Sequence, residues 1–421
     1  MTQAKQFFCL FPETIFVPGP IGGALYLLLR EKVFSLDAVR SNILKLIKNN
    51  CSLEEVSNRL GLPANEIEAF LSALEAAGAG CFVDRPYFVE KIRPLNPVEE
   101  ITFFRPSPRL TILHITPTWF CSGNCKFCRP GKPISRLQPC LGCRRKDTEK
   151  MLLLTIPQIE KAIGEAACLG CRSLLLHTGS PDYCADLIFD TLLTAEKYGY
   201  NVQLASGSPI PEKFLKHLAR PGTTLIFQIF SDSGPVHDEI AGKKGSFSLL
   251  MKNISFLKSK ELPFKLVYLN TGKDPDPHRV LLNLETLNPG AVYGDRLVGH
   301  SSQTGDFLYG SESLLPPDIS KYVTRVQGYN CLNGRLALNP DGYFSPCPSH
   351  IENKMAHISD TTVQDLFAEE TLPKYWHESN KTGEICNRCE FQFACHRCQT
   401  ALYSQKGSCI YGYDPEKGEW K

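Results

Sequence analysis

The sequence of 421 residues lacks a long apolar run and a large excess of charge of either sign. Its longest apolar stretch, residues 21–34, is far too short to span a bilayer. The net charge of +2 leaves no broad basic field for nucleic acid or for an anionic membrane surface. Residues 1–16 do not have the layout of a signal peptide, and no internal repeat is visible. We therefore expect a cytoplasmic protein with no nucleic-acid partner and no membrane partner.

Cysteine, by contrast, is abundant, with 18 residues in the chain. In a short secreted chain so many cysteines would indicate disulfides, but in a chain of this length without a signal peptide they indicate metal clusters. The hydrophobic fraction of 43% is ordinary for a globular protein and sufficient for real cores. The length predicts roughly two to four domains.

Three of the cysteines lie together in the run TPTWFCSGNCKFCRP. Cys121, Cys125 and Cys128 have the spacing C-x3-C-x2-C, and Phe127 precedes the third. Three thiolates this close can hold three irons of a [4Fe–4S] cluster and leave the fourth iron without a protein ligand, while the N–H groups of a tight loop favour an anionic cluster. The alternative is structural zinc, which requires four nitrogen or sulfur ligands in two pairs, and no fourth ligand lies nearby.

This run resembles the signature of the radical S-adenosylmethionine (SAM) enzymes. In that family SAM binds the open iron and is cleaved by one electron to methionine and a 5′-deoxyadenosyl radical. The resemblance implies an enzyme with a [4Fe–4S] cluster and SAM as cofactors, with the three cysteines as catalytic cluster ligands and Phe127 near the cofactor. It also implies an electron donor such as flavodoxin or ferredoxin.

Six apolar, β-rich runs follow a proline-spaced linker and alternate with helical stretches. The runs cover residues 110–116, 172–178, 201–206, 224–230, 264–270 and 291–300. Strands joined by helical crossovers form a parallel sheet. The fold class is therefore α/β, and six strands fit the open (β/α)6 partial barrel of the radical SAM family better than a closed TIM-like barrel of eight. In either case the chemistry belongs at the carboxyl ends of the strands.

Small and polar residues follow the second, third and fourth of these runs. After the second, the family has a Gly-Gly-Glu-Pro turn that holds the SAM amino group, and this chain matches it only at Gly179 and Pro181. Without the cysteines upstream, this segment would be an ordinary Gly-Pro turn. The resemblance implies SAM contacts from these residues and, for the ribose, from Ser231 or Asp232. The implied cofactor-binding set is Thr178, Gly179, Ser180, Pro181, Ser206, Ser231 and Asp232, with Phe127.

Two neighbouring features of the fourth loop also match the family. His237 and Asp238 correspond to a His-Asp pair that we interpret as structural. Lys243 or Lys244 is the candidate cation for the SAM carboxylate.

The C-terminal part combines weak periodicity with dense cysteine, so we expect no large hydrophobic core there. Its cysteines resemble the seven-cysteine SPASM domain of radical SAM peptide maturases, which usually holds two auxiliary [4Fe–4S] clusters. The resemblance implies one cluster on Cys331, Cys347 and Cys398, and an outer one on Cys386, Cys389, Cys395 and Cys409. The spacing before Cys398 departs from the family pattern. Two zinc ribbons are the alternative.

The remaining cysteines do not form a clear motif. Cys140 and Cys143 form a C-x2-C pair that either binds metal with a distant partner or consists of reduced loop thiols. The others are interpreted as buried thiols: Cys9, Cys51, Cys81, Cys168, Cys171 and Cys184.

The N-terminal part predicts a small winged-helix-like module. Residues 7–19 and 24–29 indicate strands, residues 37–50, 52–60 and 63–80 indicate helices, and residues 81–92 indicate a closing hairpin. DNA binding is disfavoured because no basic stripe is visible. In front of a radical SAM–SPASM pair the module resembles the domains that bind a leader peptide by strand addition. A purely structural cap is the alternative.

The predicted organisation is a peptide-recognition domain over 1–95, a radical SAM partial barrel over 96–310 and a SPASM domain over 311–421. The resemblance implies an enzyme that modifies a ribosomally synthesised precursor peptide, by oxidative cross-linking through a thioether or carbon–carbon bond. One alternative is another SPASM enzyme, such as a sulfatase-type maturase or an enzyme of redox-cofactor biosynthesis. The other is a non-catalytic peptide-binding or electron-transfer protein.

Overall fold

The structure is a computed structural model, and it describes ten segments of the chain. They are residues 7–92, 110–128, 152–296, 314–326, 331–348, 351, 353–368, 371–376, 386–395 and 413–420. The predicted domain boundaries near residues 95 and 310 lie outside these segments, as do Cys140, Cys143, Cys398 and Cys409.

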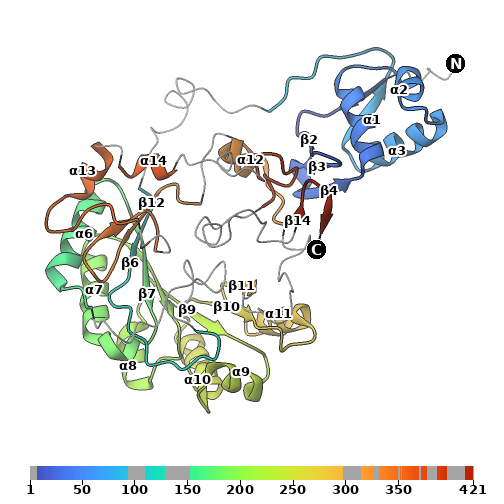
Figure 1. Ribbon diagram of the computed structural model, residues 1–421. Helices are drawn as coiled ribbons and strands as arrows, with labels where there is room; N and C mark the ends of the chain where they lie inside the picture. Colours follow the sequence, from blue (N-terminus) through green and yellow to red (C-terminus); the bar gives the residue numbers. More distant parts are fainter. Residues whose placement is uncertain are drawn as a thin grey trace.

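A single large sheet organises the central part of the molecule (Figure 1). Its strand order is β11-β10-β9-β8-β7-β6-β12-β13. The six predicted strands are confirmed as parallel neighbours in chain order: β6 (Ile112–Ile115), β7 (Ser173–Thr178), β8 (Asn201–Ser206), β9 (Thr223–Ile229), β10 (Phe264–Asn270) and β11 (Ala291–Arg296). Because β11 and β13 both end the sheet, the described strands do not close into a barrel, as the open fold predicts.

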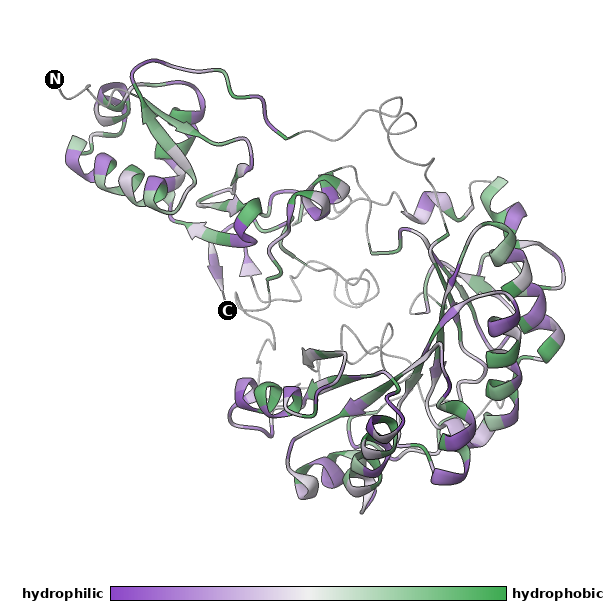
Figure 2. Cartoon of the chain, turned by 180° about the vertical axis from the view of Figure 1, so that it is seen from behind, coloured by the Kyte–Doolittle hydropathy of each residue, from purple (hydrophilic) through white to green (hydrophobic). Residues whose placement is uncertain are grey.

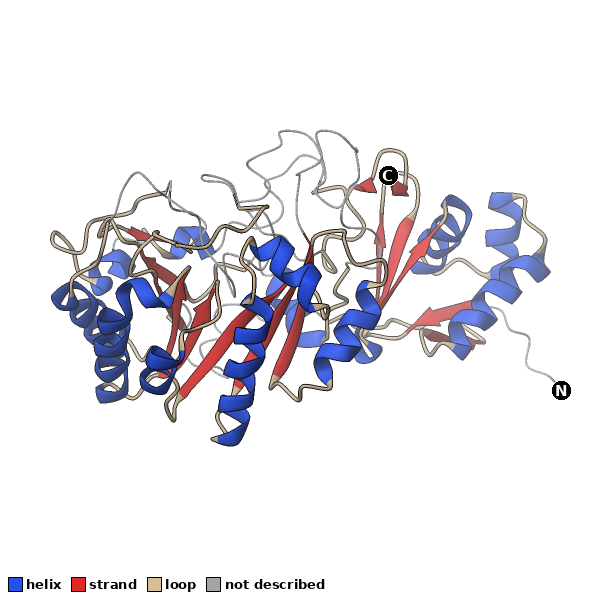
Figure 3. Ribbon diagram, turned by 90° about the horizontal axis from the view of Figure 1, so that it is seen from below, coloured by secondary structure: helices blue, strands red, loops and turns tan. Residues whose placement is uncertain are grey.

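Helices cover the outer face of this sheet (Figures 1 and 3). They are α6 (Ile156–Cys168), α7 (Ala185–Lys197), α8 (Glu212–Leu218), α9 (Gly234–Ala241), α10 (Ser246–Ser259) and α11 (Pro277–Glu285). Alternate strand residues such as Leu174, Leu204 and Phe227 pack against these helices in the main core. The strand residues between them face the other side of the sheet and form a smaller inner cluster, because successive side chains of a strand point to opposite faces. In Figure 2 the strands are largely apolar, whereas polar residues lie along the helices.

Two strands that the sequence reading missed complete the sheet. β12 (Arg335–Leu338) pairs in parallel with β6, and β13 (Phe344–Ser345) pairs antiparallel with β12. Leu336, Phe344 and Trp376 are buried in the main core. The C-terminal part therefore does not stand apart from a hydrophobic core, because its apolar residues extend the core of the large sheet.

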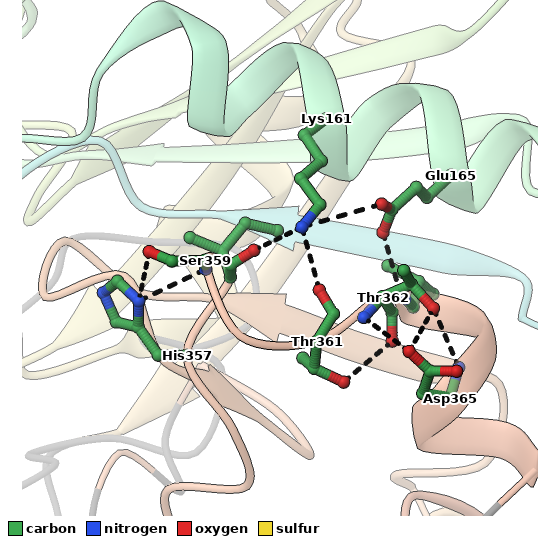
Figure 4. Close-up of polar contacts among 9 residues, drawn as sticks. Lys161, Glu165, His357, Ser359, Thr361, Thr362 and Asp365 are labelled. Atoms are coloured by element: carbon green, nitrogen blue, oxygen red, sulfur yellow. Dashed lines mark hydrogen bonds and ion pairs between the residues drawn. The ribbon is translucent and has the colours of Figure 1, made fainter.

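Polar contacts fasten the same region to helix α6, as Figure 4 shows. The Lys161 ammonium donates to the carbonyls of Ile358 (2.6 Å) and Thr361 (3.0 Å). The Glu165 carboxylate accepts the backbone N–H of Val363 at 2.8 Å, at the start of α13 (Val363–Ala368). The short helix α14 (Pro373–Trp376) then buries its tryptophan, whose indole donates to the Arg335 carbonyl at 3.0 Å.

The N-terminal part contains three helices and two small sheets. The helices α1 (Ala38–Lys48), α2 (Leu53–Leu60) and α3 (Ala64–Ala76) lie at the predicted positions. The strands are β1 (Phe7–Leu10), β2 (Thr14–Pro18), β3 (Gly23–Leu27), β4 (Lys32–Leu36) and β5 (Gly80–Val83), with the one-turn helix η1 (Leu28–Arg30) between β3 and β4. Helix α2 starts at a capping box in which Ser52 and Glu55 satisfy each other's backbone N–H groups.

The hairpin predicted over residues 81–92 is wrong. Only β5 forms, and it pairs antiparallel with β1 rather than with a strand that follows it. Pro86 interrupts the run and removes a backbone donor, so a second arm of the hairpin is disfavoured.

The sheet β2-β3-β4 is buried on both faces. Phe16, Leu25 and Leu27 pack toward the three helices. Val17 and Tyr26 point the other way and pack with residues of α12 (Ile319–Val326), of the segment 389–394 and of the hairpin β14 (Tyr413–Asp414) and β15 (Glu419–Trp420). The C-terminal hairpin therefore lies beside the N-terminal sheet (Figure 3). No helix in the described part of the chain combines the length and the apolarity that a membrane span requires.

Candidate functional site

The three-cysteine loop leaves the carboxyl end of β6, where parallel α/β folds place their chemistry. Cys121 is buried, whereas Cys125 and Cys128 are half-buried. The backbone N–H of Gly123 donates to the Cys121 sulfur at 3.3 Å, and the N–H of Cys128 donates to the Cys125 carbonyl at 3.0 Å. The loop is therefore a tight turn with a backbone donor directed at a thiol, which is the environment that suits an anionic sulfur cluster.

Helix α9 and the strand before it hold this loop from one side. The N–H of Lys126 donates to the Ile240 carbonyl at 3.0 Å. Gly242 has a φ of +64°, and a Cβ there would lie 2.2 Å from the Asn124 carbonyl oxygen. The Phe127 ring is buried edge-on against Phe230, with centroids 5.2 Å apart. Phe127 thus anchors the loop through its side chain.

The segment after β7 holds the loop from the other side. A Cβ on Gly179 would come within 2.5 Å of the Cys121 Cβ, so no larger residue fits there. The Ser180 hydroxyl lies 3.4 Å from the Cys121 sulfur and accepts the backbone N–H of Ser122 at 3.0 Å. Thr178 is buried and donates to the Ala205 carbonyl at 3.1 Å. Pro181 begins the one-turn helix η2 (Pro181–Cys184). The structure therefore brings Gly179 and Ser180 to the cysteine loop, and Thr178 and Pro181 flank them in the chain.

The predicted residues after β8 and β9 lie at the same edge but bond to different partners. Ser206 donates to the Ser208 carbonyl at 2.5 Å. Ser231 donates to the Asp274 carboxylate at 2.8 Å, and Tyr268 donates to the other oxygen of Asp274 at 2.8 Å. Asp232 accepts the side-chain amide of Asn283 at 2.6 Å. Sequence reasoning missed Asp274, whose only signal is its position shortly after the fifth strand.

His237 and Asp238 join the end of β9 to the start of α10, as their structural interpretation predicts. His237 Nδ1 accepts the N–H of Phe230 at 3.2 Å, and its Nε2 lies 3.3 Å from the Ser246 hydroxyl. Burial lowers the pKa of His237 to about 4, although the charge of Asp238 opposes this shift. Asp238 accepts the backbone N–H groups of Gly245 at 2.6 Å and Phe247 at 2.7 Å.

An exposed carboxylate that the sequence did not indicate links two loops at this edge. Glu239 pairs with Lys273, which follows β10, and with Lys126 of the cysteine loop at 2.9 Å. Hydrogen bonds from Lys273 and then Lys126 lower the pKa of Glu239 to about 2. The carboxylate is therefore ionised at neutral pH and ties the cysteine loop to the neighbouring strand end.

The described C-terminal cysteines lie in two places. Cys331 and Cys347 flank the strands β12 and β13 and pack against the main core. Cys386, Cys389 and Cys395 lie in a turn-rich segment, in which the N–H of Cys395 donates to the Phe391 carbonyl at 2.9 Å. Within the segments that the structure describes, no three cysteine, histidine or acidic side chains form a site for a single metal ion.

The donor set of the barrel loop fits an iron–sulfur cluster. Three thiols, a sulfur-directed backbone N–H and a surrounding of apolar side chains match what thiolate-bound clusters require. Residues 115–282, which include all three cysteines, match the Radical SAM superfamily. The chain therefore contains a radical SAM domain.

Solved structures share the fold of this chain. Streptococcus suis SuiB is similar with a TM-score of 0.51 and 13% identity, over 94% of this chain and 97% of SuiB. The protein anSMEcpe, solved with AdoMet and the Cp18Cys peptide, is similar with a TM-score of 0.54 and 13% identity, over 73% of this chain and 95% of anSMEcpe. No curated protein sequence matches the chain.

Proposed function

We propose that this radical SAM enzyme modifies a ribosomally synthesised precursor peptide in the cytoplasm, by closing an oxidative cross-link to a thioether or carbon–carbon bond. The observation that carries the proposal is the combination, in one chain, of a cysteine loop at the carboxyl edge of the sheet with an N-terminal sheet whose strand β4 has a free edge among the described residues. The solved complex of anSMEcpe with AdoMet and a peptide supports a peptide substrate for this fold.

In this proposal Cys121, Cys125 and Cys128 bind a [4Fe–4S] cluster, which with SAM supplies a carbon-centred radical that removes a hydrogen atom from the substrate. The chain's own residues keep the loop in place. Gly179 allows the segment after β7 to contact Cys121, and Phe127 fills the apolar space behind the turn. Both contacts pack against the loop, in which Cys121 is buried and Cys125 and Cys128 are half-buried.

The SAM contacts are assigned by position. Thr178, Gly179, Ser180 and Pro181 are proposed for the amino group, through their backbone, because Gly179 and Ser180 contact the cysteine loop. Ser206, Ser231 and Asp232 are proposed for the remainder of the cofactor. The Ser231 hydroxyl donates to Asp274 and accepts the backbone N–H of Ser233 at 3.1 Å, so one lone pair of that hydroxyl remains for the cofactor.

The C-terminal cysteines are proposed to hold two auxiliary clusters with the ligand sets given above. Cys331, Cys347 and Cys398 form the set nearer the sheet, and Cys386, Cys389, Cys395 and Cys409 form the outer one. Clusters of this kind can accept the electron released when a cross-link closes. A flavodoxin or ferredoxin is proposed to reduce the enzyme.

The leader of the precursor is proposed to add a strand to β4. This strand pairs only with β3 among the described strands, so its other edge offers backbone donors and acceptors to an extended peptide. Leader binding would raise the effective concentration of the core peptide at the cysteine loop.

The deciding experiment is anaerobic incubation of the iron-loaded enzyme with SAM, a reductant and the short peptide encoded beside its gene. We expect 5′-deoxyadenosine and a peptide that has lost two hydrogen atoms for each linkage, both measured by mass spectrometry. The Cys125→Ala variant is the control and should form neither product. SAM cleavage without any change of peptide mass would reject the peptide substrate, and full activity of Cys125→Ala would reject the cluster assignment.

A further inference from the structure

Gln228 is a buried polar residue on the inner face of the large sheet, and the proposed chemistry does not yet use it. Its strand neighbours Phe227 and Ile229 face the helices and belong to the main core. Ile226 packs on the inner face with Leu175, Ala205 and Val267, so Gln228, two residues further on, shares that face. Only 4% of Gln228 is exposed. Neither its amide nitrogen nor its amide oxygen has a hydrogen-bond partner among the described residues.

The sheet register places Gln228 in the same cross-strand row as a residue that contacts the cysteine loop. Ile226 pairs with Ala205, and Ala205 pairs with His177. The next inner-face positions on these strands are therefore Gly207 and Gly179, which have no side chains. Gly179 is the residue packed against Cys121, and Gly207 continues the ladder by donating to the Thr178 carbonyl at 2.9 Å. Gln228 thus lies in a row in which the neighbouring positions on the next two strands, Gly207 and Gly179, carry no side chain.

Two other polar atoms near this edge are also buried without a described partner. They are the indole nitrogen of Trp119, in the cysteine loop, and the hydroxyl oxygen of Thr271, directly after β10. Burying a polar group without a hydrogen-bond partner destabilises the folded state by more than a typical hydrogen bond stabilises it. Such groups are therefore uncommon in folded proteins. Gln228, Trp119 and Thr271 all lie toward the carboxyl edge of the sheet, which is where a ligand would supply the missing partners.

A second glutamine on the same face has the opposite environment. Gln203 lies near the amino end of β8, and its amide oxygen accepts the Lys265 ammonium at 3.4 Å. Gln203, at the end of the sheet where no ligand is expected, therefore has a hydrogen-bond partner within the chain. Gln228, toward the edge from which the cysteine loop leaves, has none among the described residues.

We propose that the Gln228 amide binds a backbone peptide group of the substrate residue that reacts, and so positions its carbon for hydrogen abstraction. A primary amide presents one acceptor and two donors in a plane, which complements the N–H and C=O of a peptide group. The proposal rests on the peptide-modifying function given above. Gln228 is a substrate-binding residue in this reading, distinct from the cluster ligands and from the proposed SAM contacts.

Gln228→Met is the test, because methionine keeps the length of the side chain and removes both polar groups. Gln203→Met is the matched control. In the substrate-free protein we expect Gln228→Met to raise the melting temperature by about 2–4 °C, since an unpartnered buried amide is removed. We expect Gln203→Met to leave it unchanged or to lower it.

With the neighbouring precursor peptide, Gln228→Met should lower kcat/KM for cross-linking about tenfold or more and should yield more 5′-deoxyadenosine per product, because the peptide is held less well. Iron content and SAM affinity should stay within about twofold of the wild-type values. Gln203→Met should match the wild type in all of these. Gln228→Leu repeats the measurement with a different side-chain shape, should the first variant fold poorly.

Three results would overturn the inference. A loss of SAM affinity as large as the loss of kcat/KM would assign the amide to the cofactor. A lower melting temperature of both Gln228→Met and Gln228→Leu would indicate a hydrogen-bond partner within the protein. Unchanged kcat/KM together with an unchanged ratio of 5′-deoxyadenosine to product would show that the amide has no substrate role. The proposed function fails separately, when the wild-type enzyme cleaves SAM and never alters the peptide.

Discussion

His237 is a buried base whose environment favours the neutral form. Its Nδ1 accepts the Phe230 N–H, and burial lowers its pKa from an ordinary 6.5 to about 4. Between these two pH values the unfolded chain binds a proton that the folded chain does not. Stability should therefore fall as the pH drops from 6.5 to 4, by on the order of 3 kcal/mol in total, and should be independent of this group above pH 6.5.

Urea unfolding of the wild type and of His237→Asn at several pH values checks this prediction. The asparagine oxygen can still accept the Phe230 N–H, but the side chain does not titrate. The difference in unfolding free energy between the two proteins should change with pH only below 6.5. A difference that stays constant down to pH 4 would contradict the assignment.

At the scale of single residues, the sequence predicts those whose role follows from their spacing to near neighbours in the chain. The spacing of Cys121, Cys125 and Cys128 suffices to indicate a cluster loop, and the loops after the strands indicate Ser180 and Ser231. Gln228, Asp274 and Glu239 could not be found in this way. Each matters only because of a neighbour on another strand or loop, such as the Glu239 contact with Lys126.

At the scale of elements, β4 is the strand that the proposed leader would join. Its Phe34 is 41% exposed and belongs to no described core cluster. We expect Phe34→Asp to weaken leader binding about tenfold, since an apolar contact next to the added strand is lost and a charge is introduced. The melting temperature should change little because the side chain is exposed.

Fluorescence anisotropy with a labelled leader peptide measures this effect. Leu29→Asp is the matched control, because Leu29 is 68% exposed on η1 and lies outside β4. Equal affinity of the two variants would remove β4 from the proposed leader site. SAM cleavage without peptide should be the same in both.

The elements divide into those with strong local signals and those without. Helices α1, α2 and α3 and the six parallel strands have clear caps or apolar runs, and the structure confirms them. β4 was missed because it mixes charged, polar and exposed residues with apolar ones. β12 was missed because a run of four residues is too short to show a period. The hairpin predicted over 81–92 is wrong because β5 pairs with β1, whose residues lie 70 to 76 positions earlier in the chain.

At the scale of the whole molecule, the N-terminal sheet and a C-terminal cysteine segment share one interface. The Tyr26 hydroxyl donates to the Glu390 carbonyl at 2.6 Å, and Tyr413 donates to the Glu390 carboxylate. A Cβ on Gly19 would lie 2.5 Å from that carboxylate, so the turn after β2 fits closely over it. Burial raises the pKa of Tyr26 well above its ordinary value, which keeps the hydroxyl protonated and able to donate.

Tyr26→Phe should loosen this interface, since the Glu390 carbonyl loses a buried donor at a cost of about 1–3 kcal/mol. Hydrogen exchange should speed up in residues 14–27 and 386–395 and stay unchanged in β8 and β9. Tyr183→Phe, at a half-exposed tyrosine of η2, is the control. Unaltered exchange in residues 386–395 would contradict the coupling of the two segments.

Strand β12, which covers one edge of β6, is synthesised long after β6 during translation. The strand that leads into the cysteine loop has β7 on one side, but its other neighbour is translated more than 200 residues later. Until the ribosome has passed Leu338, the backbone of Ile112–Ile115 keeps an open edge, which is a template for association with other chains. A nascent or prematurely terminated chain is therefore the aggregation-prone species.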